Sequence, residues 1–237
     1  MPFPNPRAMM APYFFEKGMS ILKNQLSSSI LKRIVILLAG LAIMAFGVAF
    51  SIKASLGTSP ISSVPYVISL FTPLTVGTAT ISMHCVFILL QILILRKNYH
   101  PIQLMQLPVA FFFGYLTDFG VWAVQGIRCQ TYLQQWIVCL IGIVLVAVGV
   151  SMEVKAGLVV LAGEGVVLAI CQVIPVKFGY MKVGFDVTLV VTACVLSLVF
   201  THSLQGVREG TVAAALMVGL IAKQLGKLWA KWPLEQV

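Results

Sequence analysis

Acidic side chains are rare in this chain of 237 residues, and most of them fall inside apolar stretches. Glu164 lies between two glycines in VVLAGEGVVLAI, and Asp186 lies in KVGFDVTLVV. If such stretches cross a membrane, a buried charge costs about 2.5–3.5 kcal/mol, so these groups usually face the protein interior and mark a path for protons or solutes. We therefore expect Glu164, together with Asp186 and His84, to bind a coupling proton or an amine. Glu153, at the end of an apolar run, is better explained as a solvated interfacial group.

His84 belongs to the same expected site, and Asp118, Arg208 and Glu209 are secondary candidates. His84 in TATISMHCVFILL can carry a proton near neutral pH, although a single hydrogen bond between helices is the more common role. Asp118 in FFFGYLTDFGVW can take part in binding a solute or ion, or it can make a structural hydrogen bond to Thr117 or a neighbouring helix. Arg208 and Glu209 are adjacent, and adjacent residues of a helix do not face each other, so we expect each to have its partner elsewhere.

A helix start could bind the opposite charge. In SIKASLGTSPISS, Ser59 is a suitable N-cap for a helix that begins at Pro60, and Ser62 follows in the first turn. A helix N-terminus inside a membrane presents unpaired N–H groups and the positive end of its dipole, which suits a carboxylate or another anion. We expect Lys53, and Lys155 in a similar stretch further along, to add positive charge. For GTSP taken alone, an ordinary capped helix after a turn is the simpler alternative.

The elements that carry these residues are predicted to be membrane helices. The chain is 59% hydrophobic and 10% charged, whereas soluble domains carry about 25% charged residues. Asp, Glu, Lys and Arg are absent from residues 34–52, 54–95, 129–152 and 187–207. About 20 apolar residues form a helix that crosses the hydrocarbon core, and a backbone in lipid must satisfy its own hydrogen bonds. The composition therefore predicts an all-α polytopic membrane protein.

An internal repeat divides the chain. GLAIMAFGVAFSIKASL, starting at Gly40, aligns without a gap on GIVLVAVGVSMEVKAGL, starting at Gly142, an offset of 102 residues. At this offset Lys53 corresponds to Lys155, Ser62 to Glu164, and His84 to Asp186. We predict an N-terminal arm over 1–32, duplicated units over 33–126 and 132–225, and a cytoplasmic tail over 226–237.

Each unit contains four apolar segments, and the second segment is short and broken by proline or glycine. The segments are 34–53, 57–72, 75–95 and 101–125 in the first unit, and 132–153, 157–175, 181–201 and 207–223 in the second. If the broken segments only re-enter the membrane, each unit has three spans and the two units are inverted, as in many secondary transporters. The re-entrant option also places more loop lysines and arginines on the cytoplasmic side, leaving Lys53, Arg128 and Arg208 outside. Eight full spans in a parallel repeat remain the alternative.

The formal net charge of +9 does not indicate a nucleic-acid partner, because the basic residues gather at the two ends of the chain. This bias predicts that both termini are cytoplasmic and that the partner is a lipid bilayer. The five cysteines lack ligand spacing, so we expect no disulfide framework, no metal and no cofactor. ATP-binding and metalloprotease motifs are absent from the sequence, and we find no nucleophile–base pair that would favour an enzyme.

The motif SLGTSP, the duplicated unit and the stretch GVREGTVAAALMVG resemble the YczE/YyaS/YitT-like bacterial membrane proteins, over about residues 33–225. The resemblance implies a polytopic protein of the bacterial inner membrane that acts as a transporter without an assigned substrate. It also implies an acid shortly after Gly-x-x-Pro in the first unit and an equivalent acid in the second. Here the first position is Ser62 and the second is Glu164, so Glu164 alone would hold that role.

These features favour a secondary transporter of a small anionic or zwitterionic solute, coupled to protons. The alternative is a membrane-embedded accessory or scaffold protein without transport activity. A transporter needs a polar site at mid-membrane that both units line, whereas a scaffold has a dry interior with its acids at the surface. The oligomeric state is left open by the sequence.

Overall fold

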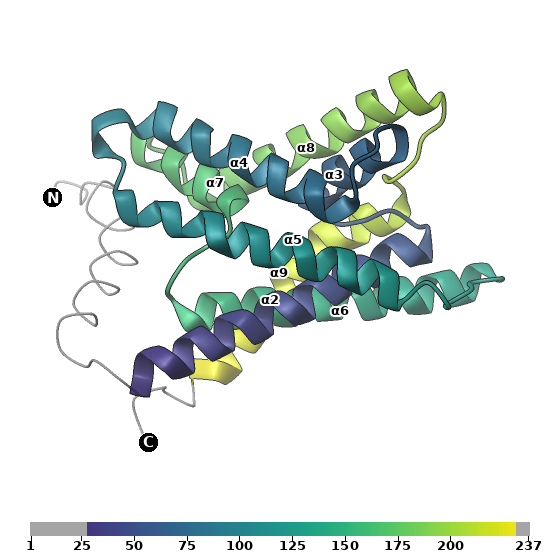
Figure 1. Cartoon of the computed structure of the whole chain (residues 1–237), viewed down its shortest axis with the longest axis horizontal. Helices are drawn as coiled ribbons and strands as arrows, with labels where there is room; N and C mark the ends of the chain where they lie inside the picture. The colour runs from purple at the N-terminus through teal and green to yellow at the C-terminus, as the bar shows by residue number, and fades with distance from the viewer. Residues whose placement is uncertain (1–27, 231–237) are drawn as a thin grey trace, which may run out of the picture.

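The computed structural model describes residues 28–230, so most of the predicted arm (1–27) and the end of the predicted tail (231–237) lie outside the described residues. The described chain contains no strands and is built of α-helices with two short 3₁₀ turns, Arg96–Asn98 and Pro101–Met105 (Figure 1). The α-helices are α2 (Ser28–Ala54), α3 (Pro60–Phe71), α4 (Val76–Leu95), α5 (Gln106–Ala123), α6 (Tyr132–Ala156), α7 (Ala162–Val173), α8 (Phe178–Thr201) and α9 (Glu209–Ala230). The prediction of an all-α fold is confirmed.

Six of these helices, namely α2, α4, α5, α6, α8 and α9, are long and apolar enough to cross a membrane. By contrast, α3 and α7 have 12 residues each. At 1.5 Å per residue each is about 18 Å long, well short of the ~30 Å hydrocarbon core. The chain therefore has the composition of a polytopic membrane protein, and the lengths of α3 and α7 disfavour eight full crossings.

The first long helices of the two predicted units, α2 and α6, pack against each other along a seam of glycines. A Cβ atom on Gly40 would lie 3.0 Å from the carbonyl oxygen of Gly149, and one on Gly47 would lie 2.8 Å from that of Gly142. Rising residue numbers in α2 meet falling numbers in α6, so the two helices are antiparallel. Small residues allow this close approach of two backbones, which is a main source of packing energy between membrane helices.

Helix bounds recur at the same offset of 102 residues that aligns Gly40 with Gly142 in the sequence. The short helices α3 and α7 correspond in both their first and last residues, α2 and α6 end at Ala54 and Ala156, and α4 and α8 begin at Val76 and Phe178. Two outer bounds differ from expectation: α2 begins at Ser28, inside the range of the arm, and α9 continues to Ala230, inside the range of the tail.

The helices form two layers (Figure 1). In the frame layer, α2 packs on α6, α5 packs on α2, and α9 packs on α6. In the site layer, α3 packs on α8 and α7 packs on α4, so each short helix lies against the third segment of the other unit. The layers meet mainly where α4 of the site layer packs against α5 of the frame layer.

Candidate functional site

The first turns of the two short helices face each other between α4 and α8. A Cβ atom on Gly163, in the first turn of α7, would lie 2.2 Å from Cδ1 of Ile61 in the first turn of α3. Ile61 and Gly163 correspond at the offset of the sequence repeat, so equivalent positions of the two units meet here. The starts of α3 and α7, with their dipoles, are thereby directed into one region of the site layer.

Glu153 holds the start of α7. Its Oε1 accepts a hydrogen bond of 2.6 Å from the N–H of Leu161, the residue that precedes α7, and the side chain is only 2% exposed. The expectation of a solvated, interfacial Glu153 is wrong because the chain turns back at Gly157, with φ of 60°, and brings the start of α7 over this carboxylate. The start of α7 therefore already has a hydrogen-bond acceptor that the chain itself supplies.

Glu164 lies in the first turn of α7 and is half-buried. Its carboxylate interacts electrostatically with Lys182 and Asp186 of α8, and also with Glu153. Lys182 and Asp186 form an ion pair across one turn of α8, with side chains that are 27% and 20% exposed. The structure therefore combines three acids and one lysine within a region that is otherwise apolar, and two of these acids, Glu164 and Asp186, are those expected from the sequence.

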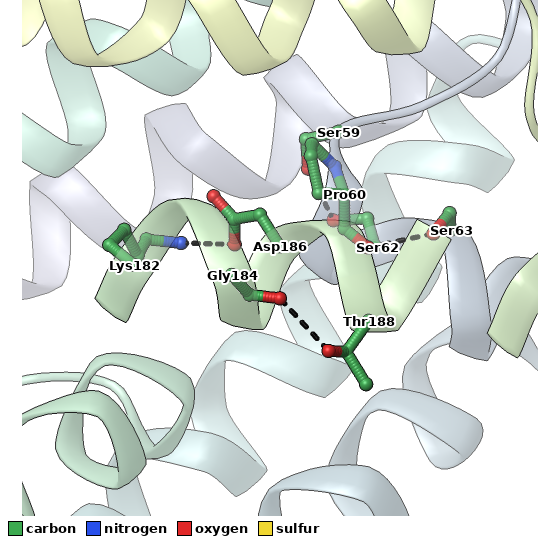
Figure 2. A network of polar contacts seen from close by, with 8 residues as sticks. All are labelled: Ser59, Pro60, Ser62, Ser63, Lys182, Gly184, Asp186 and Thr188. Carbon is green, nitrogen blue, oxygen red and sulfur yellow. Dashed lines mark hydrogen bonds and ion pairs between the residues drawn. The ribbon is translucent and has the colours of Figure 1, made fainter. Parts of the chain in front are cut away.

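The start of α3 lies beside this part of α8, as Figure 2 shows. The hydroxyl of Ser59 donates to Ser62 Oγ at 3.1 Å, while the Ser63 hydroxyl donates to the carbonyl oxygen of Pro60 at 2.7 Å. The backbone N–H groups of Ser62 and Ser63 both donate to the carbonyl oxygen of Ser59. Since proline has no N–H, this leaves the N–H of Ile61 and the hydroxyl of Ser62 to face an anion, a smaller donor set than the sequence indicated.

The two lysines expected at the site do not lie together. Lys53 is in the last turn of α2 and Lys155 is in the last turn of α6, and because these helices are antiparallel the two residues occupy opposite ends of the frame layer. The ammonium of Lys155 lies 4.6 Å from the centre of the Trp229 ring, a cation–π contact near the end of α9. The basic partner of the acids is instead Lys182.

His84 occupies an aromatic environment. It is 1% exposed, and its ring makes edge contacts with Phe87 and Phe113 at 6.2 Å between centroids. Within the described part of the chain, its Nδ1 atom has no hydrogen-bond partner. The corresponding residue of the second unit, Asp186, is paired with a lysine, so the two equivalent positions have different surroundings.

The remaining candidates have structural contacts. Asp118 caps α4 from α5: its Oδ1 accepts the N–H of Gly77 at 2.7 Å, and its Oδ2 accepts the Thr75 hydroxyl at 2.6 Å. Arg208 and Glu209 have the separate partners that were expected, the carbonyl oxygen of Ser55 and the Tyr132 hydroxyl, but they also form an ion pair of 3.1 Å with each other. Adjacent residues of a helix do not face each other, but α9 begins only at Glu209, so Arg208 is free to fold back.

A pair of buried glutamines was not anticipated from the sequence. Gln91 of α4 donates to Gln106 Oε1 at 2.9 Å and to the carbonyl oxygen of Ala162 at 3.2 Å, and Gln106 donates back to Gln91 at 3.3 Å. These bonds join α4, α5 and the start of α7. Their only signal in the sequence is the presence of two amide side chains beside apolar runs, where a buried polar group requires a partner.

A family model, described as a family of unknown function (DUF6198), matches residues 31–227. This range extends from the first turn of α2 to the end region of α9 and includes both predicted units. Neither a curated protein nor a solved structure matches the chain. Among the residues that the structure describes, no group of three or more His, Cys, Asp or Glu could hold a metal ion.

Proposed function

We propose that this chain, which belongs to the family of unknown function DUF6198, is a secondary transporter of a small zwitterionic or anionic solute, coupled to protons. The observation that carries the proposal is the gathering of Glu164, Lys182 and Asp186 beside the facing starts of α3 and α7. Ionisable residues inside membrane segments are costly and are retained mainly where they bind ions or solutes. Short helices whose N-termini face a central site are a recurrent feature of secondary transporters.

The two short helices would have different roles in binding. At the start of α7 the N–H of Leu161 already donates to Glu153, whereas the start of α3 has no acidic residue in its first turn. A carboxylate of the solute would therefore be held at α3, by Ser62, the N–H of Ile61 and the ammonium of Lys182. An amine of the same solute would pair with Glu164 or Asp186, which makes an amino-acid-like zwitterion the best match to the charges.

Coupling would arise at Glu164. A proton and a cationic group of the solute compete for the same carboxylate, so binding of one releases the other. Because Glu164 also interacts with Asp186 and Lys182, a change in its charge alters the strength of the ion pair on α8. The affinity for the solute would thereby depend on protonation.

A duplicated, inverted architecture would supply the symmetry that such a transporter needs. The recurring helix bounds, the antiparallel α2–α6 seam and the crosswise packing of α3 and α7 all support two related units of opposite orientation. With six crossings, both ends of the described chain lie on one side of the membrane. The positive-inside bias assigns that side to the cytoplasm of a bacterial inner membrane, in keeping with the resemblance to the YczE/YyaS/YitT-like proteins.

The test is uptake into proteoliposomes, with and without a pH gradient, of solutes first selected by thermal shift of the purified protein. We expect amino-acid-like zwitterions to raise the melting temperature, and we expect Glu164→Gln to abolish proton-coupled uptake while leaving the fold intact. The matched control is Glu209→Gln, which alters an exposed ion pair at the start of α9. If Glu164→Gln takes up solute at the wild-type rate with unchanged pH dependence, Glu164 does not form the proposed binding site. A protein that neither binds nor moves any solute would favour the scaffold role.

A further inference from the structure

The third and fourth segments of the repeat, α4 and α5 in the first unit and α8 and α9 in the second, pack together in the first unit but not in the second. A Cβ atom on Gly77 of α4 would lie 2.1 Å from the carbonyl oxygen of Gly114 on α5, and Gln91 and Gln106 join the same two helices further along. Their counterparts α8 and α9 have almost no contact with each other. Within the most apolar 18-residue stretch of each helix, only 17% of α8 and 11% of α9 is buried inside the protein, compared with 50% of α4 and 39% of α5.

Corresponding residues make the difference concrete. Gly179 of α8 corresponds to Gly77, but a Cβ atom placed on Gly179 would meet no atom within 4 Å. Ile81 contacts Gly114 in the first unit, whereas their counterparts Val183 and Leu216 are 63% and 65% exposed. The buried amide pair is also missing from the second unit, where the equivalent positions are Ala193 and Arg208.

The rest of the packing does obey the repeat. In the frame layer α5 lies on α2 as α9 lies on α6, and in the site layer α3 lies on α8 as α7 lies on α4. The helix packing within each layer is therefore similar for the two units. The main difference between the units lies in the contacts where the two layers meet. If the two layers move relative to each other, the contact between one pair of helices at the boundary can be lost and the contact between the corresponding pair gained. The packing within each layer does not need to change.

We propose that the structure represents one of two conformations, and that in the second the site layer rocks on the frame layer until α8 closes on α9 and α4 parts from α5. This inference deepens the proposed transport function and rests on it for its purpose, but not for its geometry. Since α2 and α6 are antiparallel, the two boundaries are related by inversion across the membrane. The movement therefore presents Glu164, Lys182 and Asp186 first to one side and then to the other.

The second conformation is tested by disulfide crosslinking in membrane vesicles, in a background in which the five native cysteines are replaced. We expect Val183→Cys with Leu216→Cys to form a disulfide within one chain, because these positions correspond to the contacting pair Ile81 and Gly114. The negative control is Val191→Cys with Leu216→Cys. Leu89, the counterpart of Val191, is 59% exposed in the first unit, where α4 packs on α5, so we expect no disulfide from this pair. The positive control is Ala49→Cys with Gly120→Cys, whose Cβ atoms would be 3.3 Å apart within the frame layer.

Two glycine replacements shift the equilibrium in opposite directions. Gly179→Leu has free space in the present conformation but obstructs closure of α8 on α9, so we expect it to lower the Val183–Leu216 crosslink several-fold. Gly77→Ala introduces a clash between α4 and α5 in the present conformation, so we expect it to raise the crosslink. Neither replacement should change the Ala49–Gly120 crosslink.

The outcomes separate this inference from the proposed function, because crosslinking requires no solute. The inference is overturned if the Val183–Leu216 yield does not exceed that of the Val191 control, if the disulfide joins two chains, or if Gly179→Leu leaves the yield unchanged. Solute uptake without any crosslink would contradict the rocking movement and leave transport standing. If the crosslink forms and responds to Gly179→Leu but the protein moves no solute, the movement is supported and the proposed transport function is refuted.

Discussion

Glu153 and Ser51 occupy corresponding positions near the ends of α6 and α2, but they act differently. The Ser51 hydroxyl donates to the carbonyl oxygen of Gly47 in its own helix at 3.0 Å. The longer side chain of Glu153 reaches the N–H of Leu161 at the start of α7 instead. One residue difference thus fixes the start of one short helix to the frame layer and leaves the start of the other without this link.

We predict that Glu153→Ala destabilises the protein more than Glu153→Gln. Alanine leaves the buried N–H of Leu161 without an acceptor, which costs about 1–3 kcal/mol, whereas the amide oxygen of glutamine can still accept. Thermal unfolding of the purified protein in detergent measures the difference. Equal melting temperatures for the two variants would mean that this hydrogen bond contributes nothing to the fold.

At the scale of elements, the buried amide pair Gln91–Gln106 explains why α4 and α5 are held together beside α7. We predict that Gln91→Leu and Gln106→Leu are each destabilising, by about 1–3 kcal/mol, because each leaves a buried amide unsatisfied. The double variant should cost less than the sum of the two, since it removes both amides. The double-mutant cycle is completed by measuring the free energies of unfolding of the wild type, both single variants and the double variant in mixed micelles. If the losses of the two single variants add up to that of the double variant, the two side chains act independently.

The glycine seam between α2 and α6 is a second element-scale feature. A Cβ atom on Gly149 would lie 2.5 Å from the carbonyl oxygen of Gly40, so we predict that Gly149→Leu forces the two helices apart and lowers the melting temperature strongly. Gly219 of α9 has no atom within 4 Å of a Cβ position, and Gly219→Leu should change stability by no more than about 0.5 kcal/mol. Similar losses in both variants would argue against the seam as the principal helix contact.

At the scale of the whole molecule, basic residues are unequally divided between the two ends of the helix bundle. The end that contains the start of α2 and the ends of α4, α6 and α9 carries Lys32, Arg33, Arg96, Lys97, Lys155, Lys223 and Lys227. The opposite end carries Lys53, Arg128 and Arg208. This distribution favours a cytoplasmic location for the first end.

We therefore predict opposite accessibility for Lys97→Cys and Arg128→Cys, which both replace exposed residues between long helices. In whole cells, a membrane-impermeant thiol reagent should label the cysteine at 128 but not the one at 97, and permeabilisation should expose the latter. Labelling of the cysteine at 97 but not of the one at 128 from the periplasm would contradict the re-entrant topology and favour eight crossings.

Much of the architecture was encoded locally and could be predicted from the sequence. Apolar runs of sufficient length specify membrane helices, because in lipid each helix satisfies its own backbone. Pro60 and the glycines around Glu164 marked the two segments that are too short to cross. The repeat offset located corresponding helix ends, and the scarcity of acids drew attention to Glu164 and Asp186, which interact electrostatically in the structure.

Only the tertiary structure decided which of these residues meet. Ile61 and Gly163, which correspond at the 102-residue offset, lie against each other at the starts of α3 and α7. Equivalent residues at helix ends, such as Lys53 and Lys155, are carried to opposite faces, so the repeat alone could not place them at one site. Glu153 and the closure of α4 on α5 depend on contacts between segments far apart in the chain, and no local pattern specifies such contacts.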